Sequence, residues 1–446
     1  MGWLASLYLL KFSTDVVGLA PALVGALFGA GRIWDALSDP LAGYWSDRTR
    51  TAWGRRRPFI LAAALPMSVG FVALWTVPSG SSPWLGGAWL GAALLLFYTG
   101  QTMFNVPHVA LGAELSQDHH DRTRVFATRA NFNHAGMLVG IGAFAWVESA
   151  AAPRLAMSGA SIAMAILSVT LILLAVPRLR ERPEYQGRGG SRPLQAARDV
   201  WRNPHARRLF PILILTELAF GCMVVSIPFA SEHLLRTPGQ TSLYLVCAIV
   251  PLAFSIPIWA VVSRRIGKKQ AWLTGSMLSA LGFVSLFFLG EGDIAWIVAG
   301  CVWIGFMTGA SQALPPSVKA DIIDLDELQT GERKEGAYFA AWNLALKAAG
   351  GLAVALAGFV LQFSGYAADA PIGQADPAGL RWLMGIFPAF FMALASLLLA
   401  GLRYGEAEHR GVREQLSERP SPDSLRVDGQ GASQSAGMPE LRRAPV

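Results

Sequence analysis

Long apolar runs recur along the whole chain and are separated by short polar segments. A helix that crosses a bilayer needs about 20 mostly apolar residues, and most of these runs reach that length. The pattern predicts an all-α membrane protein of twelve helices, the first of which is short. The predicted helices cover residues 2–13, 16–45, 58–77, 84–115, 123–150, 154–176, 209–235, 241–263, 270–290, 294–324, 335–365 and 378–402. We expect Pro107, Pro315 and Pro316 to interrupt their long helices, because proline removes a backbone hydrogen bond.

The charges of the connecting segments predict an orientation. Segments on the cytoplasmic side of a membrane protein are rich in Lys and Arg. One alternating set of segments carries 22 Lys or Arg residues, whereas the opposite set carries only Arg154, Arg236 and Arg381. This places both termini of a multi-pass membrane protein in the cytoplasm. The net charge of +7 then follows from topology, and nucleic-acid binding is not needed to explain it.

A long polar stretch at 177–208 divides the chain into two similar parts. We predict an N-terminal helical bundle over 1–176, a cytoplasmic central loop over 177–208 and a C-terminal helical bundle over 209–403. Residues 404–446 are rich in Ser, Pro, Gly, Glu and Arg, a composition typical of a disordered tail.

The sequence gives no sign of an enzyme. Three cysteines stand singly in apolar runs, at Cys222, Cys247 and Cys301, which is how small buried residues behave. We find no metal or disulfide spacing, no phosphate-binding loop and no nucleophile elbow. We therefore expect no cofactor and no ATPase site, which leaves an ion gradient as the driving force of any transport.

Asp35 and Asp39 stand inside an otherwise apolar run. An ionised carboxylate in a bilayer is costly, and it usually lines a cavity or binds a partner there. Residues four apart share a helix face, so the two carboxylates point together, with Ser38 beside them and Arg32 one turn earlier. This set suits a sodium ion or a proton. The alternative is that Arg32 neutralises Asp35 in a folding ion pair.

Several motifs occur in order along the chain. The first are Thr14–Leu19, Arg32 to Asp39 with the following proline, and Thr51 to Pro58 with its Trp-Gly-Arg core. They continue with Asn105 to Pro107, the arginines Arg122, Arg124 and Arg129, the segment Ala320–Asp324, and Glu335 followed by Lys347. This series resembles the glycoside-pentoside-hexuronide:cation symporter family of the major facilitator superfamily, typified by melibiose carriers. The resemblance implies the major facilitator fold of two six-helix bundles.

The resemblance also implies site residues. The family's matching aspartates form the cation site, with a threonine that matches Thr102. The arginine that matches Arg129 contacts sugar hydroxyls, and the lysine that matches Lys347 lies near both sites. Asn105 and Gln312 stand where melibiose carriers have an aspartate and a tryptophan, so melibiose is not the expected substrate. Asn133, four residues after Arg129, could share its face. For Arg129 and Lys347, charge balance with Asp35 and Asp39 is an equal alternative.

A basic hairpin follows the second helix and resembles the superfamily loop motif whose acid and bases pair differently as the halves move. Its residues here are Gly43, Asp47, Arg48, Arg55 and Arg56. Positive charge that merely sets the topology is the alternative, and both can hold together.

The first helix is unusual, because residues 2–13 supply only about half of a span. In family members the matching segment is some twenty residues longer and includes an acidic sugar-binding residue. We therefore expect either a start assigned too late or a truncated copy.

These observations predict a secondary active transporter that works as a monomer in the lipid bilayer of the bacterial inner (cytoplasmic) membrane. It would couple sodium or protons to symport of a small-molecule substrate, a sugar or glycoside, by alternating access. Two alternatives stay open: symport of an amphipathic, lysolipid-like substrate, and a transport-inactive sensor with the same fold.

Overall fold

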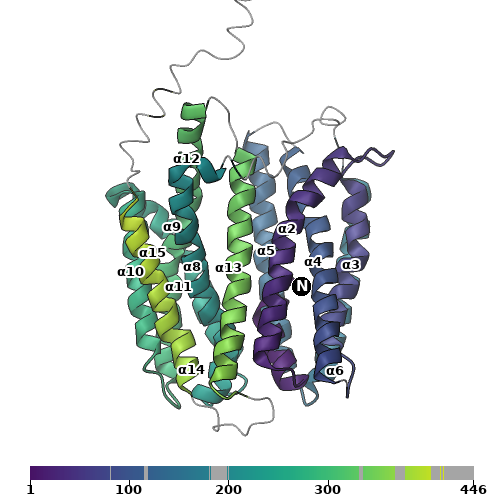
Figure 1. The fold of residues 1–446 in the computed structure, drawn as a ribbon, viewed down its shortest axis with the longest axis vertical. Helices are drawn as coiled ribbons and strands as arrows, with labels where there is room; N and C mark the ends of the chain where they lie inside the picture. The colour runs from purple at the N-terminus through teal and green to yellow at the C-terminus, as the bar shows by residue number, and fades with distance from the viewer. Residues whose placement is uncertain are drawn as a thin grey trace, which may run out of the picture.

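The computed structural model describes residues 1–80, 82–114, 119–179, 181, 198, 200–330, 335–366, 377–402, 412 and 415. Within them the chain is helical, apart from turns and one isolated bridge between Thr51 and Gly54. The helices form two groups that stand side by side, one from each half of the chain (Figure 1). The predicted tail at 404–446 lies outside the described residues, except for positions 412 and 415.

The described residues of the N-terminal half form six α-helices and two short irregular turns of helix. They are α1 (Gly2–Lys11), η1 (Phe12–Val16), α2 (Pro21–Arg48), α3 (Arg57–Trp75), α4 (Pro83–Glu114), α5 (His119–Glu148), α6 (Pro153–Ala175) and η2 (Val176–Arg178). The predicted second helix, 16–45, begins too early. Residues 12–16 continue the first helix as a π-helix, and Gly18, at φ +84°, turns the chain toward α2.

The C-terminal half follows the same plan with more interruptions. It comprises α8 (Pro204–Phe229), η4 (Ala230–Leu234), α9 (Thr241–Ile266), α10 (Lys268–Leu286), α11 (Ile294–Ala313), α12 (Pro315–Thr330), α13 (Glu335–Phe363), α14 (Ala378–Arg381), η5 (Trp382–Ile386) and α15 (Phe387–Ala400). The segment predicted as central loop, 177–208, lies largely outside the described residues, and its described end from Pro204 onward is helical. The Asn203 side chain accepts hydrogen bonds from the N–H groups of His205 and Ala206, so α8 begins at Pro204.

The prolines predicted to interrupt helices differ in their effect: Pro315 and Pro316 coincide with a break, whereas Pro107 does not. The predicted helix 294–324 is divided at Leu314, and α12 begins at Pro315, as expected for two consecutive prolines. In contrast, α4 continues through Pro107, so the predicted interruption there is wrong. One missing hydrogen bond is tolerated within a helix of 32 residues.

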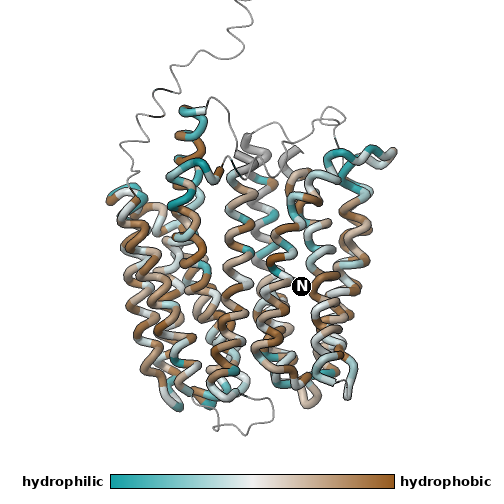
Figure 2. Tube along the Cα trace, viewed as in Figure 1, coloured by the Kyte–Doolittle hydropathy of each residue, from teal (hydrophilic) through white to brown (hydrophobic). Residues whose placement is uncertain are grey.

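Seven helical segments among the described residues are long and apolar enough to cross a membrane. They contain α3, α6, α8, α9, α11 with α12, α13, and α14 with α15. Apolar residues dominate the middle of the helices and polar ones gather at their ends, most clearly around α12 and the 49–56 hairpin (Figure 2). We call the face that carries residues 49–56 the hairpin face, and the face that carries residues 17–20 and 235–240 the opposite face.

The two halves meet along α2 and α13, near the opposite face. A Cβ atom added to Gly25 would lie 3.0 Å from the carbonyl oxygen of Val354, and one added to Gly358 would lie 2.3 Å from that of Pro21. The two backbones therefore approach more closely than any larger residue allows, a mode of packing that small residues permit between membrane helices.

Candidate cation and substrate site

Helix α2 carries the acidic residues that the sequence singled out. The spacing of three and four residues between Arg32, Asp35, Ser38 and Asp39 places them along one side of the helix. Asp35 is almost completely buried, with 1% of its surface exposed, and Asp39 is half-buried. Gly31 allows α4 to approach this side, because a Cβ atom there would lie 3.0 Å from the Tyr98 ring.

Thr102 of α4 brings the predicted cation-binding residues into one cluster of oxygen atoms. Its hydroxyl oxygen lies 3.0 Å from Asp35 Oδ1, 3.1 Å from Asp39 Oδ1 and 3.0 Å from Ser38 Oγ. A threonine hydroxyl has only one proton to donate, so it cannot satisfy both carboxylates at once. Carboxylate and hydroxyl oxygens are ligands that suit a hard cation. The cluster can therefore hold a sodium ion, or a proton shared with a carboxylate.

Lys347 of α13 enters this cluster from the other half of the chain. Its ammonium nitrogen lies 3.0 Å from Asp35 Oδ1 and 2.7 Å from Asp39 Oδ2. Arg32 Nη1 lies 3.3 Å from Asp35 Oδ2. The two carboxylates thus face two cations, and the formal charge of these four side chains is zero. The ion pair of Arg32 with Asp35, which was the alternative interpretation, is present. It does not include Asp39, which pairs with Lys347.

Arg32 also interacts with Gly351 and Glu217 of the C-terminal half. Its side chain packs against Gly351, and its guanidinium lies 5.6 Å from the centre of the Tyr98 ring of α4. Its charge interacts with that of Glu217 in α8, and Glu217 interacts in turn with Lys319 of α12. Lys319 is buried with its ammonium 5.3 Å from the Trp342 ring centre. Sequence reasoning missed Glu217, although a lone acid in an apolar run was a usable signal.

The expected substrate-binding residues come from four helices. Asn105 follows Thr102 by three residues on α4 and is half-buried. Arg129 and Asn133 are exposed on α5, one turn apart. The charge of Arg129 interacts electrostatically with His108 of α4. The His108 ring stacks on Phe104. Gln312 is exposed on α11, two residues before the break at Leu314. Of the residues predicted to bind substrate, Lys347 is the one whose described contacts lie within the oxygen cluster.

The hairpin residues form a separate network at the hairpin face. Asp47 Oδ1 accepts hydrogen bonds from Arg56 Nε at 3.3 Å and Nη2 at 2.9 Å, and Arg55 Nη1 lies 3.7 Å away. Arg48 stacks over the Tyr44 ring at 3.8 Å, and a Cβ atom at Gly43 would lie 3.5 Å from Val106.

Glu181 fixes the end of this hairpin, and sequence reasoning did not find it. Its carboxylate accepts hydrogen bonds from the backbone N–H groups of Arg55, Arg56 and Arg57, at 2.8, 2.9 and 2.8 Å. These groups lie at or just before the start of α3 at Arg57, where backbone N–H groups have no partner within the helix. A carboxylate from the segment after α6 therefore caps the first turn of α3.

Comparison with known proteins gives a consistent result. The family described as MFS/sugar transport protein matches residues 1–406. An uncharacterised symporter of Synechocystis is 25% identical, over 92% of this chain and 93% of its own. A glucuronide carrier protein homologue of Escherichia coli is 24% identical, over 89% of this chain and 87% of its own. The solved structure of the nucleoside transporter NupG has a TM-score of 0.65 at 12% identity, over 90% of this chain and 95% of its own.

Proposed function

Because the chain belongs to the MFS/sugar transport protein family, we propose that this sugar transporter is a symporter that couples a monovalent cation to a sugar or glycoside. The observation that carries the proposal is the oxygen cluster of Asp35, Asp39 and Thr102, with Lys347 bound to both carboxylates. The lysine supplies an internal cation, and the same oxygens suit a sodium ion or a proton.

The charges of the site support a coupling rule. With Arg32 and Lys347 in place, the two carboxylates are neutralised, and an empty, neutral cavity can close without burying net charge. Binding of a cation adds one positive charge, and closing a drier cavity around that charge is costly. A substrate that supplies a negative charge, or strong hydrogen-bond acceptors, removes this cost. The loaded carrier then moves, whereas the carrier with a cation alone does not.

The residues predicted to bind substrate suit a polyhydroxylated ligand. Asn105, Arg129, Asn133 and Gln312 offer amide and guanidinium groups, and Lys347 is released when a cation takes its place at the carboxylates. The glucuronide carrier homologue among the relatives bears a name that points to a sugar acid. We propose that sugars and glycosides, including acidic ones, are the substrate class.

Alternating access is the motion that the proposal requires. We propose that the hairpin face is cytoplasmic, because its segments carry most of the basic residues. Asp47 would then exchange partners between Arg55 and Arg56 as the halves move. One chain supplies both halves and the whole oxygen cluster, which supports a monomer as the functional unit.

Purified protein tests the proposal in two steps. Thermal stabilisation is measured against a panel of neutral sugars, glycosides, sugar acids and lysolipids, with and without sodium. The stabilising compound is then tested for uptake into proteoliposomes. We expect accumulation above equilibrium that requires either a sodium gradient or a proton gradient, the second being abolished by a protonophore. Facilitated uptake that ignores both gradients contradicts cation coupling, and stabilisation by lysolipids alone contradicts the sugar substrate.

A further inference from the structure

A second cluster of charged side chains lies near the opposite face, away from the cation site. Lys11, at the end of α1, pairs with Asp15 of η1 at 2.6 Å and with Glu232 of η4. The lysine side chain is only 7% exposed. Asp15 belongs to the N-terminal half and Glu232 to the C-terminal half, so one buried ammonium group joins the two halves.

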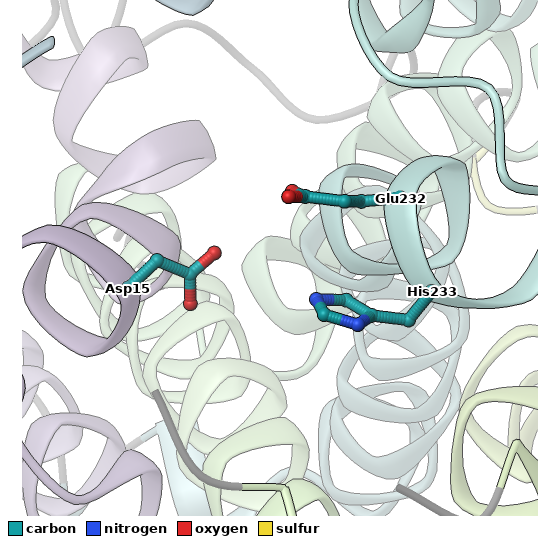
Figure 3. A group of neighbouring side chains, drawn as sticks. All are labelled: Asp15, Glu232 and His233. Carbon is teal, nitrogen blue, oxygen red and sulfur yellow. The ribbon is translucent and has the colours of Figure 1, made fainter. Parts of the chain in front are cut away.

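Two more residues of the C-terminal half complete the cluster. The Tyr366 hydroxyl, just beyond α13, donates a hydrogen bond to Asp15 Oδ1 at 2.6 Å. The same hydroxyl oxygen lies 3.1 Å from His233 Nε2. Since the tyrosine proton is used by Asp15, the imidazole is the donor in the second bond. Figure 3 shows the Asp15 carboxylate facing Glu232 and His233 across the boundary between the halves.

Other contacts close the same face. Thr241, the first residue of α9, donates a hydrogen bond of 2.6 Å to Glu148 at the end of α5. Lys11 also lies 5.4 Å from the centre of the Phe229 ring. The glycine-lined contact of α2 with α13 lies on this side as well. Among the described residues, three pairs of polar side chains therefore join the two halves at the opposite face: Lys11 with Glu232, Asp15 with Tyr366, and Glu148 with Thr241.

We propose that Lys11, with Asp15, Glu232, His233 and Tyr366, forms the extracytoplasmic gate of the transporter, and that Lys11 controls how long this gate stays closed. The inference rests on the proposed alternating access, in which the opposite face must open to admit substrate. Opening breaks the bonds of Lys11 to Glu232 and of Tyr366 to Asp15, because their partners belong to different halves. The pair of Lys11 with Asp15 remains, since both lie on the N-terminal half.

The lysine is the residue whose loss has the largest expected effect. One oxygen of each of Asp15 and Glu232, and a ring nitrogen of His233, lie within 4.8 Å of one another. This set has the composition of a metal site, but the Lys11 ammonium already bonds to both carboxylates and serves as the counter-ion. Without it, two carboxylates face each other across the boundary, and their repulsion favours separation of the halves.

The experiment measures accessibility of position 105, which lies on α4 three residues after Thr102 of the oxygen cluster, and uses neither substrate nor ion gradient. Asn105→Cys is placed in a variant whose three cysteines, Cys222, Cys247 and Cys301, are replaced. A membrane-impermeant maleimide is applied from the extracytoplasmic side. We expect Lys11→Met to raise the labelling rate about tenfold, the factor that corresponds to ~1.4 kcal/mol. Glu232→Gln, which breaks the contact without leaving two bare carboxylates, should raise it less.

A matched control is available at the same face. Arg236 pairs with Glu291 at 3.0 Å, but both are exposed and both belong to the C-terminal half. Arg236→Ala should leave labelling unchanged.

Labelling of Lys11→Met and Glu232→Gln at the rate of the parent overturns the gate, as does an equal rise in Arg236→Ala. If Lys11→Met does not fold, Glu232→Gln and Tyr366→Phe decide by the same readout. A gate that behaves as expected in a protein that does not accumulate substrate would refute the coupling proposal alone.

Discussion

The ammonium nitrogen of Lys347 lies 2.7 Å from Asp39 Oδ2, although 308 residues separate the two in the chain. The contact joins α13 of one half to α2 of the other at the depth of the oxygen cluster. A lysine that occupies the carboxylates is a competitor for any cation that binds there, and it belongs to the other half of the chain. Release of this contact can therefore connect cation binding to movement of the halves.

Replacement of either carboxylate by an amide should abolish coupling. Asp39→Asn and Asp35→Asn remove the charge that attracts the cation but keep the shape of the side chain. We expect substrate to equilibrate across proteoliposomes without being accumulated, so the steady-state concentration ratio falls to about one, since no ion gradient is coupled to movement. Each variant leaves one positive charge of the site without its partner, which lowers stability, so folding of the purified variant is verified by its thermal unfolding transition. Asp293→Asn, at the opposite face, is the control and should accumulate substrate at the parental level. Accumulation by Asp39→Asn at the parental level would refute the proposed cation site.

Removal of the internal competitor should strengthen cation binding. Lys347→Met leaves Asp35, Asp39 and Thr102 in place without the ammonium group. We expect the coupling cation to bind about tenfold more tightly, a gain of ~1.4 kcal/mol, measured by titrating the ion against thermal stability. Lys269→Met is the control, because Lys269 bonds the carbonyls of Ala400 and Leu402, away from the site. Equal or weaker binding in Lys347→Met would show that the lysine supports the site instead of competing for it.

The sequence was sufficient for the parts of this site that depend on local periodicity. Asp35, Ser38 and Asp39 share a helix side because of their spacing, and two consecutive prolines explain the break before Pro315. The contact with Thr102 followed only from resemblance, because periodicity does not tell which helix packs against α2. The same limit explains the missed gate.

The residues of the gate show where sequence reasoning stopped. Lys11 and Glu232 are visible as single charges near the ends of apolar runs, but they lie 221 residues apart and their pairing depends on how the halves dock. Glu217 was equally visible, and its interactions with Arg32 and Lys319 come from two other helices. A charge in an apolar run identifies a functional position, whereas its partner requires the three-dimensional arrangement.

The zero net charge of the four central side chains predicts how membrane potential acts. With one monovalent cation, an anionic glycoside crosses as a neutral complex, whereas a neutral glycoside crosses with one positive charge. We expect an inside-negative potential to accelerate uptake of the neutral substrate but not of the anionic one. The measurement imposes a potassium diffusion potential on proteoliposomes at fixed ion gradients. Equal acceleration of both substrates would mean that the resting site is not neutral.

Arg129 should recognise substrate by its planar group of donors. Arg129→Lys keeps the charge and loses the geometry that two parallel hydrogen bonds require. We expect substrate affinity to fall at least about tenfold, or ~1.4 kcal/mol, while cation affinity in the absence of substrate is unchanged. Binding of both is measured by thermal stabilisation. If substrate affinity is retained and cation affinity changes, Arg129 balances charge and does not contact substrate.

The contact of Gly358 with Pro21 should control the closed state of the opposite face. A Cβ atom at position 358 would lie 2.3 Å from the Pro21 carbonyl oxygen, which belongs to the backbone and cannot rotate away. Gly358→Ala must therefore push α13 from α2, at a cost of about 1–3 kcal/mol, the usual range for an overpacked contact. Separation of the halves relieves this cost, so the variant should favour the state that is open at this face.

The maleimide assay at position 105 measures the shift, and we expect labelling to accelerate at least about fivefold, the lower end of that range. Gly159→Ala is the matched control, because no atom lies within 4 Å of its Cβ position. Equal labelling of the two variants would mean that the α2–α13 contact does not separate during opening.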